Sequence, residues 1–279
     1  MEKKLQQAII ITGATGSIGK ELAKALCGTG RPIILAVRNV AKGEAVVREI
    51  LRDNKDACVL VRRLDLADID SVKEFAQGIT DECDSVYALL NNAGIMNRFF
   101  STTKQGIETT MGVNLINTAA LTHLIAPSIV DGGHVVFTTS ITRNLHSADS
   151  ISVDVDATHF SQLGTYGKSK AALTHYALYM CLLYPKLKIN CADPGVVNSG
   201  MITMNRWYDG LANLIFRPLI RTPRQGAKAA LRAMTLPSGG HVVTAGGASV
   251  IPYDAYDRAH ASLVESIRAK VFELIMPTS

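Results

Sequence analysis

Short runs of aliphatic and β-branched residues alternate along this chain with longer stretches in which apolar residues recur every three or four positions. The short runs predict buried strands, and the longer stretches predict amphipathic helices. Strands are expected at Ala8–Thr12, Pro32–Val37, Cys58–Leu64, Val86–Asn91, His134–Thr139, Lys188–Ala192 and His241–Val243. Helices are expected at Ile18–Gly28, Ala41–Asn54, Ile69–Asp81, Ile107–Ala126, Thr165–Leu183 and Pro223–Met234.

This alternation predicts an α/β fold, a doubly wound parallel sheet of about seven strands with helices on both faces. Right-handed crossovers leave a crevice at the carboxyl ends of the strands, where such sheets bind their ligands. The chain has 279 residues, no Pro/Ser-rich linker and no internal repeat. We therefore expect a single domain over residues 1–279.

A glycine-rich turn follows the first predicted strand and opens the first predicted helix. It reads Thr12-Gly13-Ala14-Thr15-Gly16-Ser17-Ile18-Gly19. Glycines let the backbone turn tightly and approach a pyrophosphate, while the helix amino terminus offers free N–H groups and a partial positive charge. We predict that a dinucleotide binds this turn. The contacts expected are Gly13, Thr15, Gly16, Ser17, Ile18 and Gly19.

The second predicted strand ends without a carboxylate, in Val37-Arg38-Asn39. Binders of NAD usually place a carboxylate here to accept from the ribose hydroxyls, and that group would repel a 2′-phosphate. The guanidinium of Arg38 suits a phosphate instead. We predict cofactor contacts from Arg38 and Asn39 and favour NADP(H) over NAD(H). A solvated strand end is the alternative role for Arg38.

Tyr166 and Lys170 lie four positions apart on a predicted helix, so they share one face. An ammonium beside a phenol favours the phenolate and lowers a pKa that is near 10 in water. A tyrosine tuned in this way can exchange a proton with an alcohol or a carbonyl. Such a spacing is common on helices, so the pair indicates a catalytic role only in combination with the other motifs of the chain.

Four motifs follow one another along the chain: the glycine-rich turn, Asn91-Asn92-Ala93-Gly94, the Tyr166 and Lys170 pair, and Pro194-Gly195. In this order they resemble the short-chain dehydrogenase/reductase family over nearly the whole chain. The family has a Rossmann-type fold and transfers a hydride between a nicotinamide cofactor and a carbonyl or alcohol. The resemblance therefore implies an oxidoreductase that acts on a small-molecule carbonyl or alcohol with NADP(H).

The resemblance also implies a catalytic set of Asn114, Ser140, Tyr166 and Lys170. Ser140 follows the fifth predicted strand and would hold the substrate oxygen beside Tyr166, the proton donor or acceptor. Lys170 would lower the tyrosine pKa and bond the nicotinamide ribose. Asn114 would bend its helix and hold a water for proton exchange with solvent.

Further cofactor contacts are implied at the ends of three other strands. The third strand end would meet the adenine, the fourth the adenine-side ribose, and the sixth the nicotinamide carboxamide. In that order the residues are Asp65 and Leu66; Asn92, Ala93 and Gly94; and Pro194, Gly195, Val197 and Ser199. A helix N-cap is the alternative role for Asp65.

The glycine spacing of the turn leaves two other functions open. The order Gly13, Gly16, Gly19 departs from most single-domain members and is also typical of sugar-nucleotide epimerases and dehydratases. Those enzymes usually have a longer carboxyl-terminal region than the one that follows Pro223 here. A non-catalytic NADP(H)-sensing regulator is the second alternative, although relatives of that kind commonly lose the tyrosine or the lysine.

Two segments bear on the substrate. Ser140 and Tyr166 are 26 residues apart, a longer gap than in shorter family members. This insert resembles the retinol-dehydrogenase-like branch, as does Arg38-Asn39 followed by Lys42-Gly43-Glu44, and its role in selectivity is open. A substrate lid is expected at about 199–222. Its apolar stretch Met201–Phe216 suggests a hydrophobic substrate, with core packing or a subunit contact as alternatives.

Composition narrows the expected partners. The net charge of +5 comes from dispersed Lys and Arg, and only 6% of residues are aromatic, so no nucleic-acid site is expected. No apolar run is long enough for a membrane span. The five cysteines are scattered without a CxxC, which favours a reduced, cytoplasmic protein and no metal site. The resemblance implies a possible homodimer or homotetramer contact through the predicted helices at 107–126 and 165–183, and their apolar faces fit burial within one chain equally well.

Overall fold

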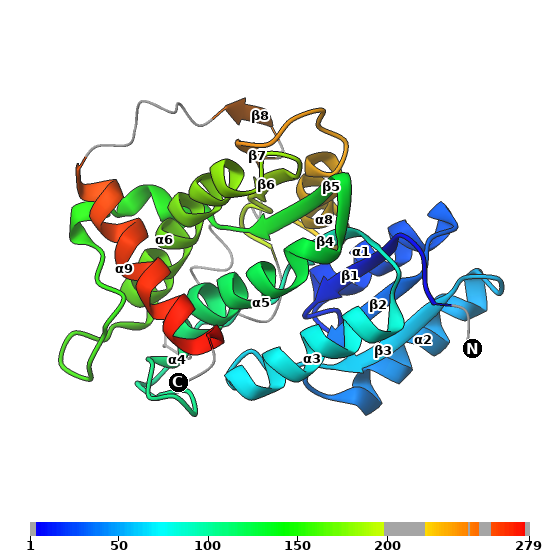
Figure 1. Ribbon diagram of the computed structural model, residues 1–279, viewed down its shortest axis with the longest axis horizontal. Helices are drawn as coiled ribbons and strands as arrows, with labels where there is room; N and C mark the ends of the chain where they lie inside the picture. The colour runs from blue at the N-terminus through cyan, green and yellow to red at the C-terminus, as the bar shows by residue number, and fades with distance from the viewer. Residues whose placement is uncertain (1–3, 198–220, 245, 251–257, 277–279) are drawn as a thin grey trace.

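The computed structural model describes residues 4–197, 221–244, 246–250 and 258–276. Within them, eight strands form one sheet in the order β3-β2-β1-β4-β5-β6-β7-β8 (Figure 1). All neighbours are parallel except β7 and β8, which are antiparallel. The strands are β1 Ala8–Thr12, β2 Ile33–Val37, β3 Val59–Arg63, β4 Val86–Asn91, β5 Ile129–Thr138, β6 Lys188–Ala192, β7 His241–Thr244 and β8 Gly247–Val250. The predicted doubly wound parallel sheet is confirmed.

Helices cover both faces of the sheet. One face carries α1 (Ser17–Leu26), α2 (Val40–Asp53) and α8 (Pro223–Ala233), and the other carries α3 (Ile69–Glu82), α5 (Asn117–Ile125), α6 (Gln162–Leu183) and α9 (Arg258–Ile275). The alternation of side chains along β1 separates the two cores. Ile10 packs in the core with α3, α5, α6 and α9, whereas Ile9 and Ile11 pack in the core with α1, α2 and α8.

Several parts of the fold differ from the sequence-based expectation. The strand β8 was not predicted, and β5 begins at Ile129 instead of His134. The predicted helix Ile107–Ala126 is divided into α4 (Thr109–Met111), a π-helical turn (Gly112–Ile116) and α5. It starts late because the Glu108 carboxylate accepts hydrogen bonds from the backbone N–H groups of Thr110 and Met111 and thereby caps α4.

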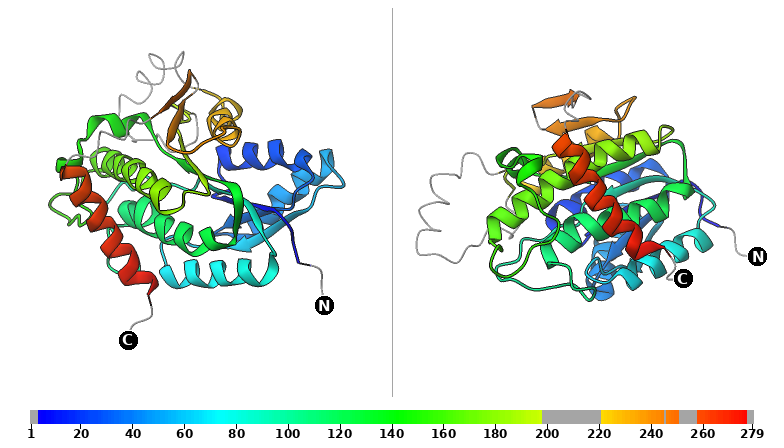
Figure 2. Two further views of the ribbon diagram at one scale, coloured as in Figure 1. Left: turned by 45° about the horizontal axis from the view of Figure 1, so that its top comes forward. Right: turned by 60° about the vertical axis from the view of Figure 1, so that its left-hand side comes forward.

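The helix α9 was not predicted either, and it lies across α5 and α6 (Figures 1 and 2). His123 of α5 marks this contact. Its Nδ1 and Nε2 lie 2.8 and 2.9 Å from the hydroxyls of Tyr184 and Tyr176, and its ring lies 5.1 Å from that of Phe272 in α9. Ile267 of α9 is fully buried. Part of the apolar surface of α5 and α6 is therefore covered by the chain itself.

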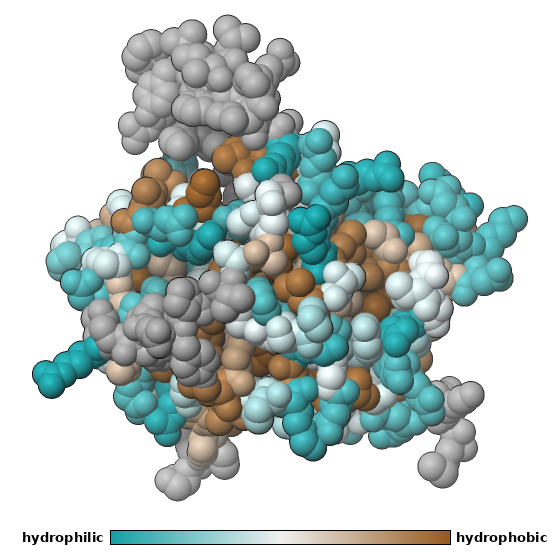
Figure 3. Space-filling model, turned by 90° about the horizontal axis from the view of Figure 1, so that it is seen from above, coloured by the Kyte–Doolittle hydropathy of each residue, from teal (hydrophilic) through white to brown (hydrophobic). Residues whose placement is uncertain are grey.

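The outer surface of the molecule is mixed in character. The face in Figure 3 intersperses hydrophilic and hydrophobic side chains, with apolar residues gathered near its middle. None of the helices among the described residues has the length and apolar character needed to cross a bilayer.

Candidate active site

The glycine-rich turn joins β1 to α1, and two of its glycines are required by close packing. Gly13 has a φ of +64°, and a Cβ there would come within 2.8 Å of the Cα of Ala93. At Gly19 a Cβ would come within 2.5 Å of the Gly13 carbonyl oxygen. The turn can therefore lie against the end of β4 only because these positions have no side chain.

The residues of this turn fit a dinucleotide phosphate. The helix α1 begins after Gly16, and no side chain caps it, so its first N–H groups have no intrahelical acceptor. The Ser17 hydroxyl is buried and has no hydrogen-bond partner within the described structure. A buried hydroxyl without a partner costs about 1 to 3 kcal/mol. A phosphate bound here would accept from both the hydroxyl and the helix terminus. Thr15 is exposed at the turn, and Ile18 is half-buried.

The end of β4 holds this turn in place. The side-chain amide of Asn92 donates to the carbonyl of Thr12 at 3.0 Å, and the Ala93 N–H donates to the Thr12 hydroxyl at 3.0 Å. A Cβ at Gly94 would lie 3.1 Å from the Nζ of Lys170. The predicted contacts Asn92, Ala93 and Gly94 therefore link the glycine-rich turn to the lysine of the candidate catalytic pair.

Arg38 and Asn39 lie together at the carboxyl end of β2. Arg38 is exposed, and its guanidinium has no hydrogen-bond or ion-pair partner among the residues described. The Asn39 side chain is already used, because it accepts from the Lys42 N–H at 3.0 Å and caps α2. Of the two, Arg38 is the residue left available for an anionic ligand.

Asp65 and Leu66 lie in the turn between β3 and α3. The Asp65 carboxylate accepts from the Ala67 N–H at 3.0 Å, but the N-cap of α3 is Asp68. The N-cap alternative for Asp65 was therefore wrong. Leu66 is buried, and its carbonyl accepts from the side-chain amide of Asn117 at 2.8 Å. Asp65 is the more accessible of the two predicted contacts.

Ser140 and Tyr166 meet although the insert separates them in sequence. The Ser140 hydroxyl lies close enough to the Tyr166 phenol to lower the pKa of Tyr166. Burial has the larger effect and raises that pKa, and the negative charge of Asp193 raises it further. The net direction is upward. It is opposite to the direction that the Tyr-Lys spacing alone predicts.

Lys170 is buried at 2% exposure on the same helix face as Tyr166. Its ammonium donates to the carbonyl of Thr138 at 2.8 Å and lies 5.9 Å from the centre of the Tyr166 ring. Burial lowers the pKa of Lys170 to about 8. The lysine is thus fixed by the end of β5, next to the phenol but without a described hydrogen bond to it.

Asn114 lies in the π-helical turn, so the predicted distortion of its helix is present. Its side-chain oxygen accepts from the Ile95 N–H at 2.8 Å. Its amide donates to the Ile95 carbonyl at 2.9 Å and to the Ser169 hydroxyl at 3.1 Å. The side chain therefore ties the loop after β4 to α6, next to Lys170. The water relay stays a prediction.

The turn after β6 contains a buried ion pair that was not predicted from the sequence. Arg143, from the insert, lies 2.5 Å from the Asp193 carboxylate, and the two side chains are 15% and 5% exposed. Asp193 also accepts from the Gly195 N–H at 2.9 Å. Arg221 donates to the Pro194 carbonyl at 3.4 Å. Two arginines therefore flank the predicted carboxamide segment.

Part of the predicted segment cannot be placed. Val197 is buried and pairs with Arg221 in an isolated β-bridge. Ser199 lies outside the described residues, as does the predicted lid except for its last residues, 221 and 222.

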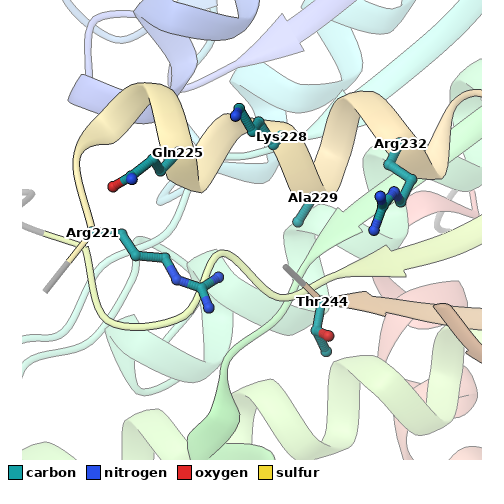
Figure 4. A pocket seen from close by; sticks show the side chains of 6 residues that line it. All are labelled: Arg221, Gln225, Lys228, Ala229, Arg232 and Thr244. Atoms are coloured by element: carbon teal, nitrogen blue, oxygen red, sulfur yellow. The ribbon is translucent and has the colours of Figure 1, made fainter. Parts of the chain in front are cut away.

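A cavity of about 470 Å³ lies between α8 and the end of β7 (Figure 4). Its lining residues are Arg221, Gln225, Lys228, Ala229, Arg232 and Thr244. Lys228 and Arg232 are exposed on α8, and in Figure 4 Arg232 lies on the same side of the helix as Ala229. Arg221 alone among them also contacts the Pro194-Gly195 turn, so the cavity adjoins the candidate site without containing its catalytic residues.

Residues 7–208 match the family described as short chain dehydrogenase. The chain belongs to this family. It is 32% identical over 229 residues to human retinol dehydrogenase 12, covering 81% of this chain and 72% of that protein. It is 28% identical over 246 residues to human polyprenol dehydrogenase, covering 83% of this chain and 74% of that protein. The predicted resemblance to the retinol-dehydrogenase-like branch is thereby confirmed.

Solved structures agree with the short-chain dehydrogenase fold. A Mycobacterium paratuberculosis protein matches with a TM-score of 0.70 and 26% identity, covering 96% of this chain and 92% of that one. An Escherichia coli CFT073 putative short chain dehydrogenase, complexed with NADPH, matches with a TM-score of 0.67 and 23% identity over 86% and 96% of the two chains. As a member of the family, the chain is an oxidoreductase that acts on CH–OH groups with NAD or NADP.

Proposed function

We propose that this chain is an NADP(H)-dependent oxidoreductase for the carbonyl or alcohol group of a hydrophobic substrate, with Tyr166 as the proton donor or acceptor. The observation that carries the proposal is the closeness of the Ser140 hydroxyl to the Tyr166 phenol, with the buried ammonium of Lys170 at 5.9 Å from the centre of the phenol ring. A hydroxyl, a phenol and a cation then surround one point at the carboxyl edge of the sheet. A carbonyl oxygen needs a proton donor and a hydrogen-bond donor of this kind.

Each side chain has a distinct role at the substrate oxygen. Ser140 donates a hydrogen bond that holds the oxygen beside Tyr166, and Tyr166 gives its proton in reduction or takes one in oxidation. The phenol is protonated near neutral pH, and burial raises its pKa, so its proton transfer depends on groups that stabilise the phenolate. The charge of Lys170, 5.9 Å from the ring, stabilises the phenolate that remains after transfer. When bound, the cofactor supplies or accepts the hydride.

The preference for NADP(H) rests on Arg38. Its guanidinium is exposed at the end of β2 without a partner among the residues described, where a 2′-phosphate would provide one. The strand end Val37-Arg38-Asn39 has no acidic residue to oppose that phosphate. A hydrophobic substrate is supported by the names of two relatives, a retinol dehydrogenase and a polyprenol dehydrogenase.

A substrate panel tests this proposal. The purified chain is mixed with NADPH and aldehydes or ketones, or with NADP and alcohols, of graded chain length, and nicotinamide absorbance is followed. We expect turnover that rises with the apolar length of the substrate. Sugar nucleotides are included in the same panel. Turnover of a sugar nucleotide with no turnover of any simple carbonyl would indicate the epimerase alternative and refute the proposal. NADPH binding without any turnover would indicate the regulator.

A further inference from the structure

The ion pair between Arg143 and Asp193 joins two segments that the proposed mechanism must keep in register. Arg143 lies in η4 (Ile141–Leu145), the first turn of the insert, and Asp193 follows β6. The two residues are 50 positions apart in sequence. Both side chains are largely buried, so this is not one of the exposed pairs that contribute little to structure.

Each partner of the pair also forms a hydrogen bond with the backbone of a nearby residue in its own segment. Besides its bond to Asp193, the same guanidinium nitrogen of Arg143 donates to the carbonyl of Ser140 at 2.9 Å. The second carboxylate oxygen of Asp193 accepts from the Gly195 N–H at 2.9 Å. Gly195 has a φ of +72°, a left-handed conformation that this hydrogen bond helps to hold. The pair is therefore hydrogen-bonded to the backbone of the Ser140 turn and to that of the Pro194-Gly195 turn.

We propose that Arg143 and Asp193 are positioning residues, which lock the Ser140 turn to the Pro194-Gly195 turn and set the charge balance around the Tyr166 phenol. This inference rests on the proposed function, because it assigns the pair to the tyrosine that exchanges the proton. It also gives a role to the insert between Ser140 and Tyr166, since the first turn of the insert delivers the arginine.

The charged and titratable groups near Tyr166 determine how the Arg143–Asp193 pair affects the phenol. Asp193 is linked through Arg143 to the Ser140 carbonyl, and its charge raises the pKa of Tyr166, whereas the Ser140 hydroxyl lowers it. Lys170 is the ammonium on the same helix, 5.9 Å from the centre of the ring. His146, also from the insert, packs against Gly167, where a Cβ would lie 2.6 Å from its Nε2. Burial and the charge of Lys168 lower the pKa of His146, so this imidazole is neutral when the phenol titrates.

Neutralising the two partners one at a time should move the tyrosine pKa in opposite directions. Asp193→Asn removes the negative charge that opposes the phenolate and leaves the arginine cation unpaired, so phenolate becomes easier to form. Arg143→Gln leaves the carboxylate without its counter-ion, so phenolate becomes harder to form. If the pair had a purely structural role, both substitutions would shift the tyrosine pKa in the same direction, because each would weaken the same contact between the two turns.

The test is a pH titration of tyrosinate absorbance in the cofactor-free protein. Each variant is measured against the same variant carrying Tyr166→Phe, so that the difference reports Tyr166 alone. We expect a downward shift of about half a unit or more for Asp193→Asn, an upward shift of similar size for Arg143→Gln, and a value between them for the double variant. Shifts in one direction, or no shift in folded variants, would overturn the proposal.

If one single variant does not fold, the stability of the double variant tests the proposal instead. The double variant contains no unpaired buried charge, and the amide oxygen that Asp193→Asn introduces can still accept from the Gly195 N–H, so the double variant should fold. A double variant as unstable as the failing single variant would overturn the pairing. The titration needs no substrate. An inactive protein that shows the opposite shifts would therefore contradict the proposed function but support the positioning pair.

Discussion

Lys170 should make the protein less stable at neutral pH, and replacing it by methionine should raise stability while removing activity. The lysine is 2% exposed, and burial lowers its pKa from 10.5 to about 8. At about 1.4 kcal/mol for each pH unit, the buried charge costs about 3 kcal/mol near pH 7. Methionine has a similar length and no charge, but it leaves the Thr138 carbonyl without its donor, at a cost of about 1 to 3 kcal/mol. We expect a net gain of up to about 2 kcal/mol for Lys170→Met.

The linkage between folding and proton binding gives this prediction a second signature. The folded lysine has the lower pKa, so between about pH 8 and pH 10.5 the unfolded chain binds more protons than the folded chain. The stability of the parent should therefore rise with pH across this window, and Lys170→Met should lose that rise.

Urea unfolding of cofactor-free protein at several pH values measures both effects. Lys168→Met is the matched control, because Lys168 is on the same helix and is partly exposed. The control should change the free energy of unfolding by less than about 0.5 kcal/mol. If Lys170→Met is less stable than the parent at neutral pH, or if the control gains as much, the cost assigned to the buried ammonium is wrong.

Two further predictions concern the cofactor and acid stability. Arg38→Glu should abolish a preference of about tenfold or more for NADPH over NADH, measured as dissociation constants by titration; equal affinities in the parent would exclude the role of Arg38. His123 and His134 are buried, and burial lowers the pKa of each to about 4. The unfolded chain therefore binds more protons below about pH 6.5, and stability should fall by up to about 3 kcal/mol for each histidine between that pH and about pH 4. Urea midpoints that do not change over this range would contradict the burial of neutral imidazoles.

The sequence predicts that residues of the candidate site lie together because the fold places strand ends at one edge of the sheet. Gly13, Arg38, Asn92 and Ser140 each follow a strand by one or two positions. In a parallel sheet with right-handed crossovers, such positions share one edge whatever lies between them. Local patterns that identify strands and their ends are therefore sufficient to predict which residues gather there.

Contacts that depend on tertiary packing were not predictable in the same way. The Arg143–Asp193 pair joins residues 50 positions apart, and neither has a local signal that distinguishes it from a solvated charge. The raised pKa of Tyr166 depends on burial, which the Tyr-Lys spacing does not report. The strand β8 is a short Gly-Ala-Ser-Val segment that pairs at the sheet edge through its backbone, so its composition gives no apolar signal.

The helix α9 was not predicted either, although the sequence does contain an apolar pattern typical of a helix there. Leu263, Val264, Ile267 and Val271 recur at helical spacing, and the structure buries all four. This helix covers part of the surface of α5 and α6 for which the sequence left a subunit contact and burial within the chain equally open.

The central claim is that Tyr166 transfers the proton at the substrate oxygen. The most direct test compares the parent with Tyr166→Phe on the best carbonyl substrate of the panel, measuring NADPH affinity and turnover in the same preparation. We predict unchanged NADPH affinity and a loss of turnover of about 100-fold or more, since general acid catalysis contributes about that much. Turnover within a few-fold of the parent, at equal NADPH affinity, would contradict the account.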